Sequence, residues 1–119
     1  MFSPLLLDHF QNPRNAGELA GANVRVEVSN PVCGDVLQLA AVVDRKTIRE
    51  VRFLCRGCTA SIACASMLTE LIQGKESSTL ARLAPEDLSA SLGGLPPASF
   101  HAAQLAYDAL LALLGEIKD

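Results

Sequence analysis

The period of the hydrophobic pattern changes near residue 59 of this 119-residue chain. Before that point, three segments show the alternating or continuously apolar pattern of β-strands. These segments are 24–29, 35–43 and 47–55. Because only short connections join them, we expect consecutive strands to pair antiparallel. The first half of the chain therefore predicts a three-stranded antiparallel sheet.

Helical patterns lie on both sides of the predicted strands. At the start, Ser3 can cap a short helix that has Pro4 in its first position and that Pro13 stops. Further helices are predicted from Thr59 to Gly74, over 78–83 and 86–92, and from Ser99 to Leu114. Strands first and helices afterwards predict an α+β fold with helices packed on one face of the sheet.

Length and composition limit the possible functions. Single domains commonly span about 100 to 150 residues, so we expect one domain over residues 1–119. The net charge of −3 and the scattered basic residues give no reason to expect nucleic-acid binding. No apolar stretch approaches the roughly 18 to 20 residues of a membrane span, and no secretory signal pattern is visible. We therefore expect a cytoplasmic protein that binds neither nucleic acid nor membranes.

The chain has four cysteines. In the reducing cytoplasm, a non-random cysteine pattern indicates metal or sulfur chemistry, although free cysteine is also an ordinary core residue. Cys55 shares a strand face with Val51 and Phe53, and Cys64 lies on the apolar stripe of its helix. Both are predicted to be core residues, so we do not interpret Cys55 and Cys58 as a redox or zinc pair.

The segment from Pro31 to Asp35 joins two predicted strands. Gly34 permits a tight turn that can present the flanking side chains of Cys33 and Asp35 to one point. A thiolate and a carboxylate in such proximity are natural metal ligands, with the carboxylate the more exchangeable of the two. The alternative is a plain turn in which Cys33 fills space and Asp35 acts as a capping group.

Cys58 is expected at the N-terminus of the helix that begins near residue 59. The positive end of the helix dipole and the free backbone N–H groups favour a thiolate there. Arg56 adds positive charge nearby, and Gly57 lets the backbone approach whatever Cys58 holds. Cys58 could then bind a metal or accept sulfur. The alternative is an inert cysteine in a strand-to-helix turn.

Five parts of the chain resemble the iron–sulfur cluster assembly scaffolds IscU, SufU and the N-terminal part of NifU. They are 8–15, 31–35, 57–58, 95–97 and His101. The resemblance implies an α+β fold and a cluster, usually [2Fe–2S], built from iron and from sulfur given by a cysteine desulfurase. It also implies transfer of the cluster to recipient apoproteins. Such a protein is a binding and transfer module, and we expect no enzyme activity.

The resemblance also implies the ligands. Cys33 and Cys58 match the first two family cysteines, Asp35 matches the family aspartate, and His101 matches the family histidine. The third family cysteine follows that histidine directly, where this chain has Ala102. The remaining four residues could complete a mixed-ligand site, and the same four would suit tetrahedral zinc.

A second departure concerns a partner. In the family, the segment recognised by an Hsp70-type chaperone continues after Leu95-Pro96-Pro97 with Val-Lys, and that Lys is missing here. Chaperone docking is therefore in doubt. Two alternatives to a cluster scaffold stay open: a zinc-bound sulfur acceptor that activates a desulfurase, and a degenerate paralogue with an interaction role.

Overall fold

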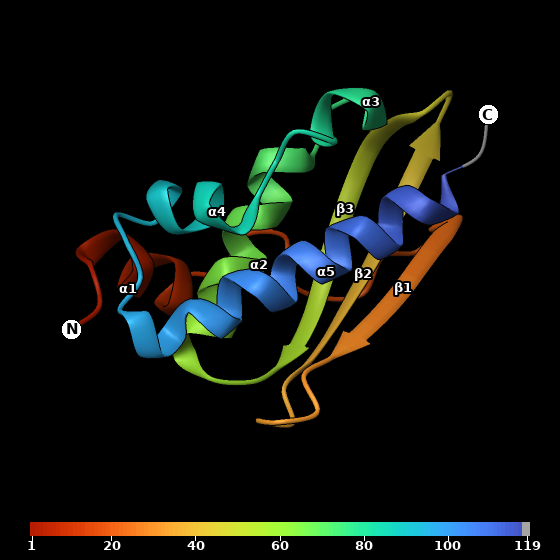
Figure 1. The fold of residues 1–119 in the computed structure, drawn as a ribbon. Coiled ribbons are helices and arrows are strands. Elements are labelled where there is room, and N and C mark those ends of the chain that lie inside the picture. The colour runs from red at the N-terminus through yellow and green to blue at the C-terminus, as the bar shows by residue number, and fades with distance from the viewer. Residues whose placement is uncertain (118–119) are drawn as a thin grey trace.

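Three strands and five α-helices form two layers in the computed structural model, which describes residues 1–117 (Figure 1). The strands, in their order across the sheet, are β1 (Val24–Ser29), β2 (Val36–Asp44) and β3 (Thr47–Arg56). The helices are α1 (Pro4–Gln11), α2 (Thr59–Ile72), α3 (Ser77–Leu80), α4 (Pro85–Ser91) and α5 (Phe100–Glu116), with a 3₁₀ turn at Pro97–Ser99. The predicted α+β class is confirmed. The last two residues of the expected domain lie outside the described part.

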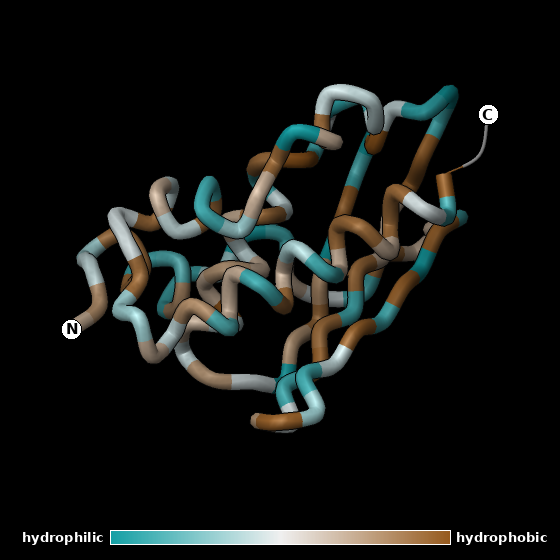
Figure 2. Tube along the Cα trace, viewed as in Figure 1, coloured by the Kyte–Doolittle hydropathy of each residue, from teal (hydrophilic) through white to brown (hydrophobic). Residues whose placement is uncertain are grey.

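Antiparallel pairing of neighbouring strands gives the sheet one apolar face. The register aligns Val26 of β1 with Leu39 of β2 and Phe53 of β3. Leu39 and Phe53 are buried, and α2 and α5 pack against the sheet on this side. Figure 2 shows the alternation of hydrophobic and hydrophilic residues along β1 that places one set of side chains on each face. None of the described helices has the length and hydropathy that crossing a membrane requires.

The ends of α1 follow from its local sequence. Ser3 Oγ accepts a hydrogen bond from the backbone N–H of Leu6 at 3.0 Å, and Pro4 occupies the first turn. The helix ends at Asn12, directly before Pro13. Ser3 Oγ also donates to the carbonyl of Leu92, which ties the start of α1 to the end of α4.

His9 attaches α1 to α2. It is buried, with Nδ1 2.8 Å from Ser66 Oγ and Nε2 3.4 Å from a carboxylate oxygen of Glu70. Burial lowers the pKa of His9 below its ordinary value, although the Glu70 carboxylate opposes the shift. His9 therefore acts as a neutral packing residue.

Helix α2 lies at the centre of the helical layer. Ten of its 14 residues are buried, because it contacts α1, α4, α5 and β3. Small residues such as Ala60, Ala63 and Ala65 allow these neighbours to approach closely. The first turn of α2 is thereby fixed in position beside the end of β3.

Candidate metal centre

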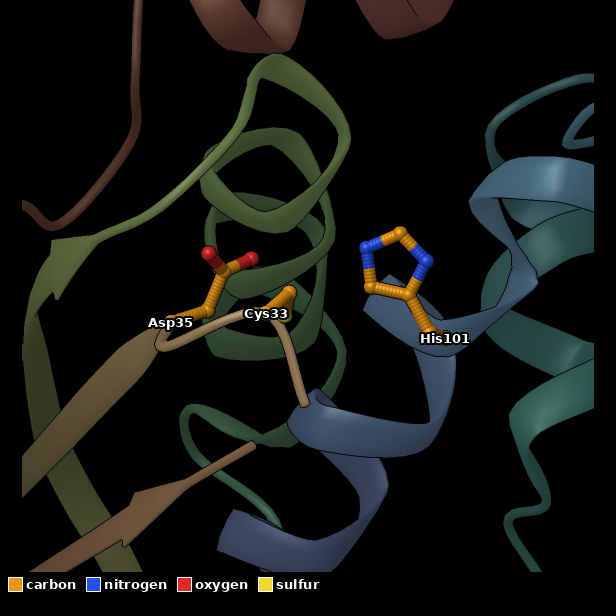
Figure 3. A group of neighbouring side chains, drawn as sticks. All are labelled: Cys33, Asp35 and His101. Atoms are coloured by element: carbon orange, nitrogen blue, oxygen red, sulfur yellow. The ribbon is translucent and has the colours of Figure 1, made fainter. Parts of the chain in front are cut away.

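Cys33, Asp35 and His101 meet at one rim of the molecule. One ligand atom of each residue lies within 4.8 Å of the other two: the cysteine sulfur, a carboxylate oxygen and a ring nitrogen. Cys33 and Asp35 belong to the loop between β1 and β2, whereas His101 belongs to the first turn of α5. Figure 3 shows the imidazole beside the loop that carries the other two side chains. The fold thus brings together groups that are far apart in sequence.

Cys58 lies beside this group. Its sulfur is 3.8 Å from Nε2 of His101 and 3.3 Å from Oγ of Ser61. Cys58 is the N-cap residue of α2, so its sulfur lies near free backbone N–H groups and the positive end of the helix dipole. The thiols of Cys33 and Cys58 are both close enough to the Asp35 carboxylate to help lower its pKa. The two sulfurs therefore lie on the same side of the molecule.

Backbone hydrogen bonds shape the loop that carries Cys33 and Asp35. The side-chain oxygen of Asn30 accepts from the backbone N–H of Val32 at 2.9 Å and of Cys33 at 3.4 Å. The Asn30 backbone N–H donates to the Asp35 carbonyl at 2.8 Å and closes the loop. Gly34 has φ +77°, a conformation that other residues rarely adopt. This turn holds the side chains of Cys33 and Asp35 at the same rim.

The Asp35 carboxyl group is buried but well supplied with donors. Ser61 Oγ donates to Oδ2 of Asp35 at 2.5 Å. Burial by itself would raise the pKa of Asp35, but hydrogen bonds from Ser61, the Cys58 backbone and the two thiols outweigh it. The pKa of Asp35 is therefore below its ordinary value. Asp35 is ionised at neutral pH and available as an anionic ligand.

Ser61 is a site residue that the sequence pattern alone did not identify. It is buried in the first turn of α2 and bridges Asp35 and Cys58. Because its single hydroxyl proton is donated to Asp35, Ser61 can act only as the acceptor in its contact with the Cys58 sulfur. Its only signal in the sequence is a hydroxyl placed three residues after Cys58, in the first turn of the helix.

The ring of His101 is oriented by a backbone carbonyl. Its Nδ1 lies 3.1 Å from the carbonyl oxygen of Ala98. Because a carbonyl oxygen only accepts hydrogen bonds, Nδ1 is the donor and carries the proton. That tautomer leaves the lone pair of Nε2 free, on the side that faces Cys58. The next residue, Ala102, is only 1% exposed and offers no ligand atom.

Gly57 makes the close approach of α2 to Asp35 possible. A methyl group added at Gly57 would lie 2.9 Å from Cγ of Asp35 and 3.0 Å from Cβ of Ser61. We expect Gly57→Ala to move the Asp35 carboxylate and to lower the affinity for added Zn²⁺ by about 10- to 100-fold, as loss of a supporting contact at a metal site does. Competition with a chromogenic chelator measures this affinity.

The matched control for that variant is Gly115→Ala. An added methyl group at Gly115 meets no atom within 4 Å, so zinc affinity should stay at the wild-type value. Equal affinities of Gly57→Ala and the wild-type protein would show that Asp35 does not need its present position to bind the metal.

The other two cysteines are less accessible than Cys33 and Cys58. Cys64 is 0% exposed, and Cys55 is half-buried on the helix-facing side of β3, in register with Leu37. Burial raises the pKa of Cys55 to about 11 and that of Cys64 to about 12. Cys64 is confirmed as a core residue, and neither thiol ionises readily near neutral pH.

The four thiols should therefore differ in reactivity. In the metal-free folded protein at pH 8, we expect iodoacetamide to modify exposed Cys33 and Cys58 at least tenfold faster than Cys55 and Cys64, because the thiolate is the reactive form. Peptide mass spectrometry over time measures each rate. Denatured protein is the control, in which all four should react alike. Rapid modification of Cys64 in the folded state would contradict its burial.

Comparison with known proteins identifies the family. Residues 1–118 match the model of the NifU-like N terminal domain. The chain belongs to this family. A relative named iron–sulfur cluster assembly scaffold protein IscU 1, from Archaeoglobus fulgidus, is 40% identical over 110 residues that span 92% of this chain and 72% of the relative. The scaffold protein IscU of Aquifex aeolicus is also 40% identical, over 92% of this chain and 71% of its own length.

Solved structures of NifU-like proteins share the fold. A SufU-type scaffold protein from Fervidobacterium islandicum superposes with a TM-score of 0.77 over 95% of this chain and 96% of that chain, at 22% identity. The N-terminal part of a NifU-like protein from Brucella abortus gives a TM-score of 0.66 over 92% and 76% of the two chains, at 17% identity. The expected family resemblance and sheet arrangement are therefore confirmed.

Proposed function

We propose that this chain is a scaffold on which an iron–sulfur cluster is assembled and from which it passes to recipient apoproteins. The main support is the convergence of Cys33, Asp35 and His101 within 4.8 Å, with Cys58 3.8 Å from His101. The family membership and the scaffold names of the relatives support the same role.

The donor set explains why the cargo is held only for a time. Two thiolates, one imidazole and one carboxylate make four ligands, which is two for each iron of a [2Fe–2S] cluster. Cys33 and Cys58 would be the strong ligands, and Asp35 the most exchangeable one. Since Cys33 and Cys58 are exposed, a recipient protein can reach the cargo directly.

The partners follow from the chemistry of the cargo. A cysteine desulfurase supplies the sulfur, and recipient apoproteins take the finished cluster. The chain thus acts as one binding and transfer domain in the cytoplasm, where thiols stay reduced, and not as an enzyme. We do not include an Hsp70-type chaperone among the partners, because the Lys of its motif is absent.

Anaerobic reconstitution tests this function. Incubation of the purified chain with Fe²⁺, cysteine, a desulfurase and dithiothreitol, which reduces the transferred sulfur to sulfide, should give a coloured protein. Its visible absorbance should survive gel filtration, with iron and sulfide in equal amounts. Omitting the desulfurase is the control. A protein that stays colourless and iron-free would count against the scaffold role.

The same four donors favour a second candidate, a zinc-bound sulfur acceptor that activates a desulfurase. Thiolate, imidazole and carboxylate are the ligands that tetrahedral zinc uses in proteins. Gently purified protein would then contain one zinc ion per chain, and added protein would accelerate desulfurase turnover. If the protein neither binds a metal nor affects the desulfurase, a degenerate paralogue with an interaction role becomes the better interpretation.

A further inference from the structure

The two edges of the sheet differ in how they are covered. Along β3, the backbone of Phe53 donates a hydrogen bond to Asn15 and accepts one from Gly17. The segment 74–77 covers the start of the same strand. The other edge is β1 (Figure 1), and within residues 1–117 no backbone hydrogen bond reaches its outer side. An uncovered edge strand of this kind can pair with a further strand.

The register of β1 identifies the backbone groups that point to the open edge. The N–H of Asn30 donates to the Asp35 carbonyl at 2.8 Å, so these two residues form a hydrogen-bonded pair of the β1–β2 ladder. Hydrogen-bonded and non-hydrogen-bonded pairs alternate along antiparallel strands, and the register is regular over Val24–Ser29. Every second residue, counted back from Asn30, therefore bonds to β2. The N–H and C=O groups of Arg25 and Glu27 lie between those residues and point outward.

The side chains of β1 alternate between apolar and charged. Val24, Val26 and Val28 are half-buried and pack against the core. Arg25 and Glu27 are exposed on the other face of the sheet. The strand is therefore symmetric about Val26 in its valines, with one positive and one negative side chain at equal distances on either side.

A second copy of β1 fits this edge in one antiparallel register. With the twofold axis at Val26, Arg25 lies opposite Glu27 of the other copy, and both residues have outward backbone groups. An axis at Arg25 would place two arginines opposite each other, and an axis at Glu27 would do the same with two glutamates. Opposite charges directly across a strand pair are favourable, and like charges are unfavourable. Charge complementarity thus favours another copy of this chain and the register centred on Val26.

The present contacts of the two charged side chains leave room for this pairing. Nη2 of Arg25 donates to the Leu19 carbonyl at 2.9 Å, and Nη1 lies 4.0 Å from a carboxylate oxygen of the exposed Glu18. Glu27 accepts a hydrogen bond from Gln38 at 2.7 Å with one carboxylate oxygen. Its other oxygen has no hydrogen bond within the described part of the chain and can accept from an arginine of the other copy.

We propose that two copies of this chain pair through β1 and form one continuous sheet, with three strands from each copy. On the helix-facing side, Val26 lies opposite its counterpart and Val24 lies opposite Val28, so this side of the pair is apolar. The loop that carries Cys33 follows the end of β1. Antiparallel pairing therefore places the two metal centres at opposite ends of the interface. The dimer does not depend on the proposed function.

Sedimentation equilibrium of the full-length, metal-free chain tests the pairing. We expect a monomer–dimer equilibrium whose limiting mass is twice the 12.6 kDa of one chain. Amide hydrogen exchange at Arg25 and Glu27 should slow as the protein concentration rises, whereas exchange at Val26, which bonds to β2, should not change. A chain that stays monomeric up to about 1 mM overturns the proposal.

Charge reversal locates the interface. Arg25→Glu and Glu27→Arg should each raise the dissociation constant of the dimer about tenfold or more, because each variant places like charges opposite each other in both symmetric pairs. An equal mixture of the two variants should restore the dimer, since every glutamate then meets an arginine. Arg82→Glu makes the same change of charge at an exposed position elsewhere and should dimerise like the wild-type protein. Wild-type dimerisation of both single variants, or a mixture that stays monomeric, overturns the proposal.

Discussion

Cys58→Ala leaves the protein colourless after anaerobic reconstitution, whereas Cys64→Ala gives the wild-type yield of cluster. The Cys58 sulfur faces the helix N-terminus and lies 3.8 Å from Nε2 of His101, so its loss removes one of two strong ligands. Cys33 would then be the single thiolate of the group, whereas protein iron–sulfur clusters are held by at least two. Visible absorbance and iron content after gel filtration measure the effect.

Two further variants make this test specific. Cys33→Ala should have the same result as Cys58→Ala, because it removes the other thiolate of the group. Cys64 is buried in α2 among alanines, so Cys64→Ala removes a thiol and keeps the fold, which circular dichroism verifies. Full cluster yield in both Cys33→Ala and Cys58→Ala would exclude these residues as ligands.

Much of the fold could be predicted from local sequence. Alternation in 24–29 and 47–55 and a continuously apolar pattern in 35–43 identified the three strands to within a residue or two. Ser3, Pro4 and Pro13 set the limits of α1. The short helix predicted over 78–83 is the exception, since α3 covers Ser77–Leu80. Of its residues only Leu80 is buried, so its position depends on tertiary packing that no local pattern records.

The site could be predicted only in part. Cys33 and Asp35 are adjacent to one glycine, and Cys58 precedes a helix, so local chemistry indicated each of them. The proximity of these three residues to His101 depends on how α5 packs on the sheet. It could therefore be expected only from the family resemblance. Ser61 could not be identified from the sequence, because its role requires the contact with Asp35, which no spacing rule predicts.

Ala102→Cys is expected to lengthen the lifetime of the reconstituted cluster several-fold. The residue directly follows His101 on the first turn of α5, and the resemblance to IscU-type scaffolds implies a third cysteine at this position. A thiolate binds cluster iron more strongly than a carboxylate does, so a third cysteine could replace Asp35 as a ligand. The decay of visible absorbance after addition of a chelator measures the lifetime, and a change in the absorption spectrum would report the new ligand.

Ala103→Cys provides the matched control for the restored thiol. Ala103 is also buried, at 0% exposure, but it lies about 100° further around the helix. Both substitutions add one sulfur atom to the packed core, so they should have similar small costs in stability. Only the cysteine at 102 should slow the loss of iron. Equal effects of the two variants would show that the mixed donor set of Cys33, Asp35, Cys58 and His101 is not what limits the lifetime of the cluster.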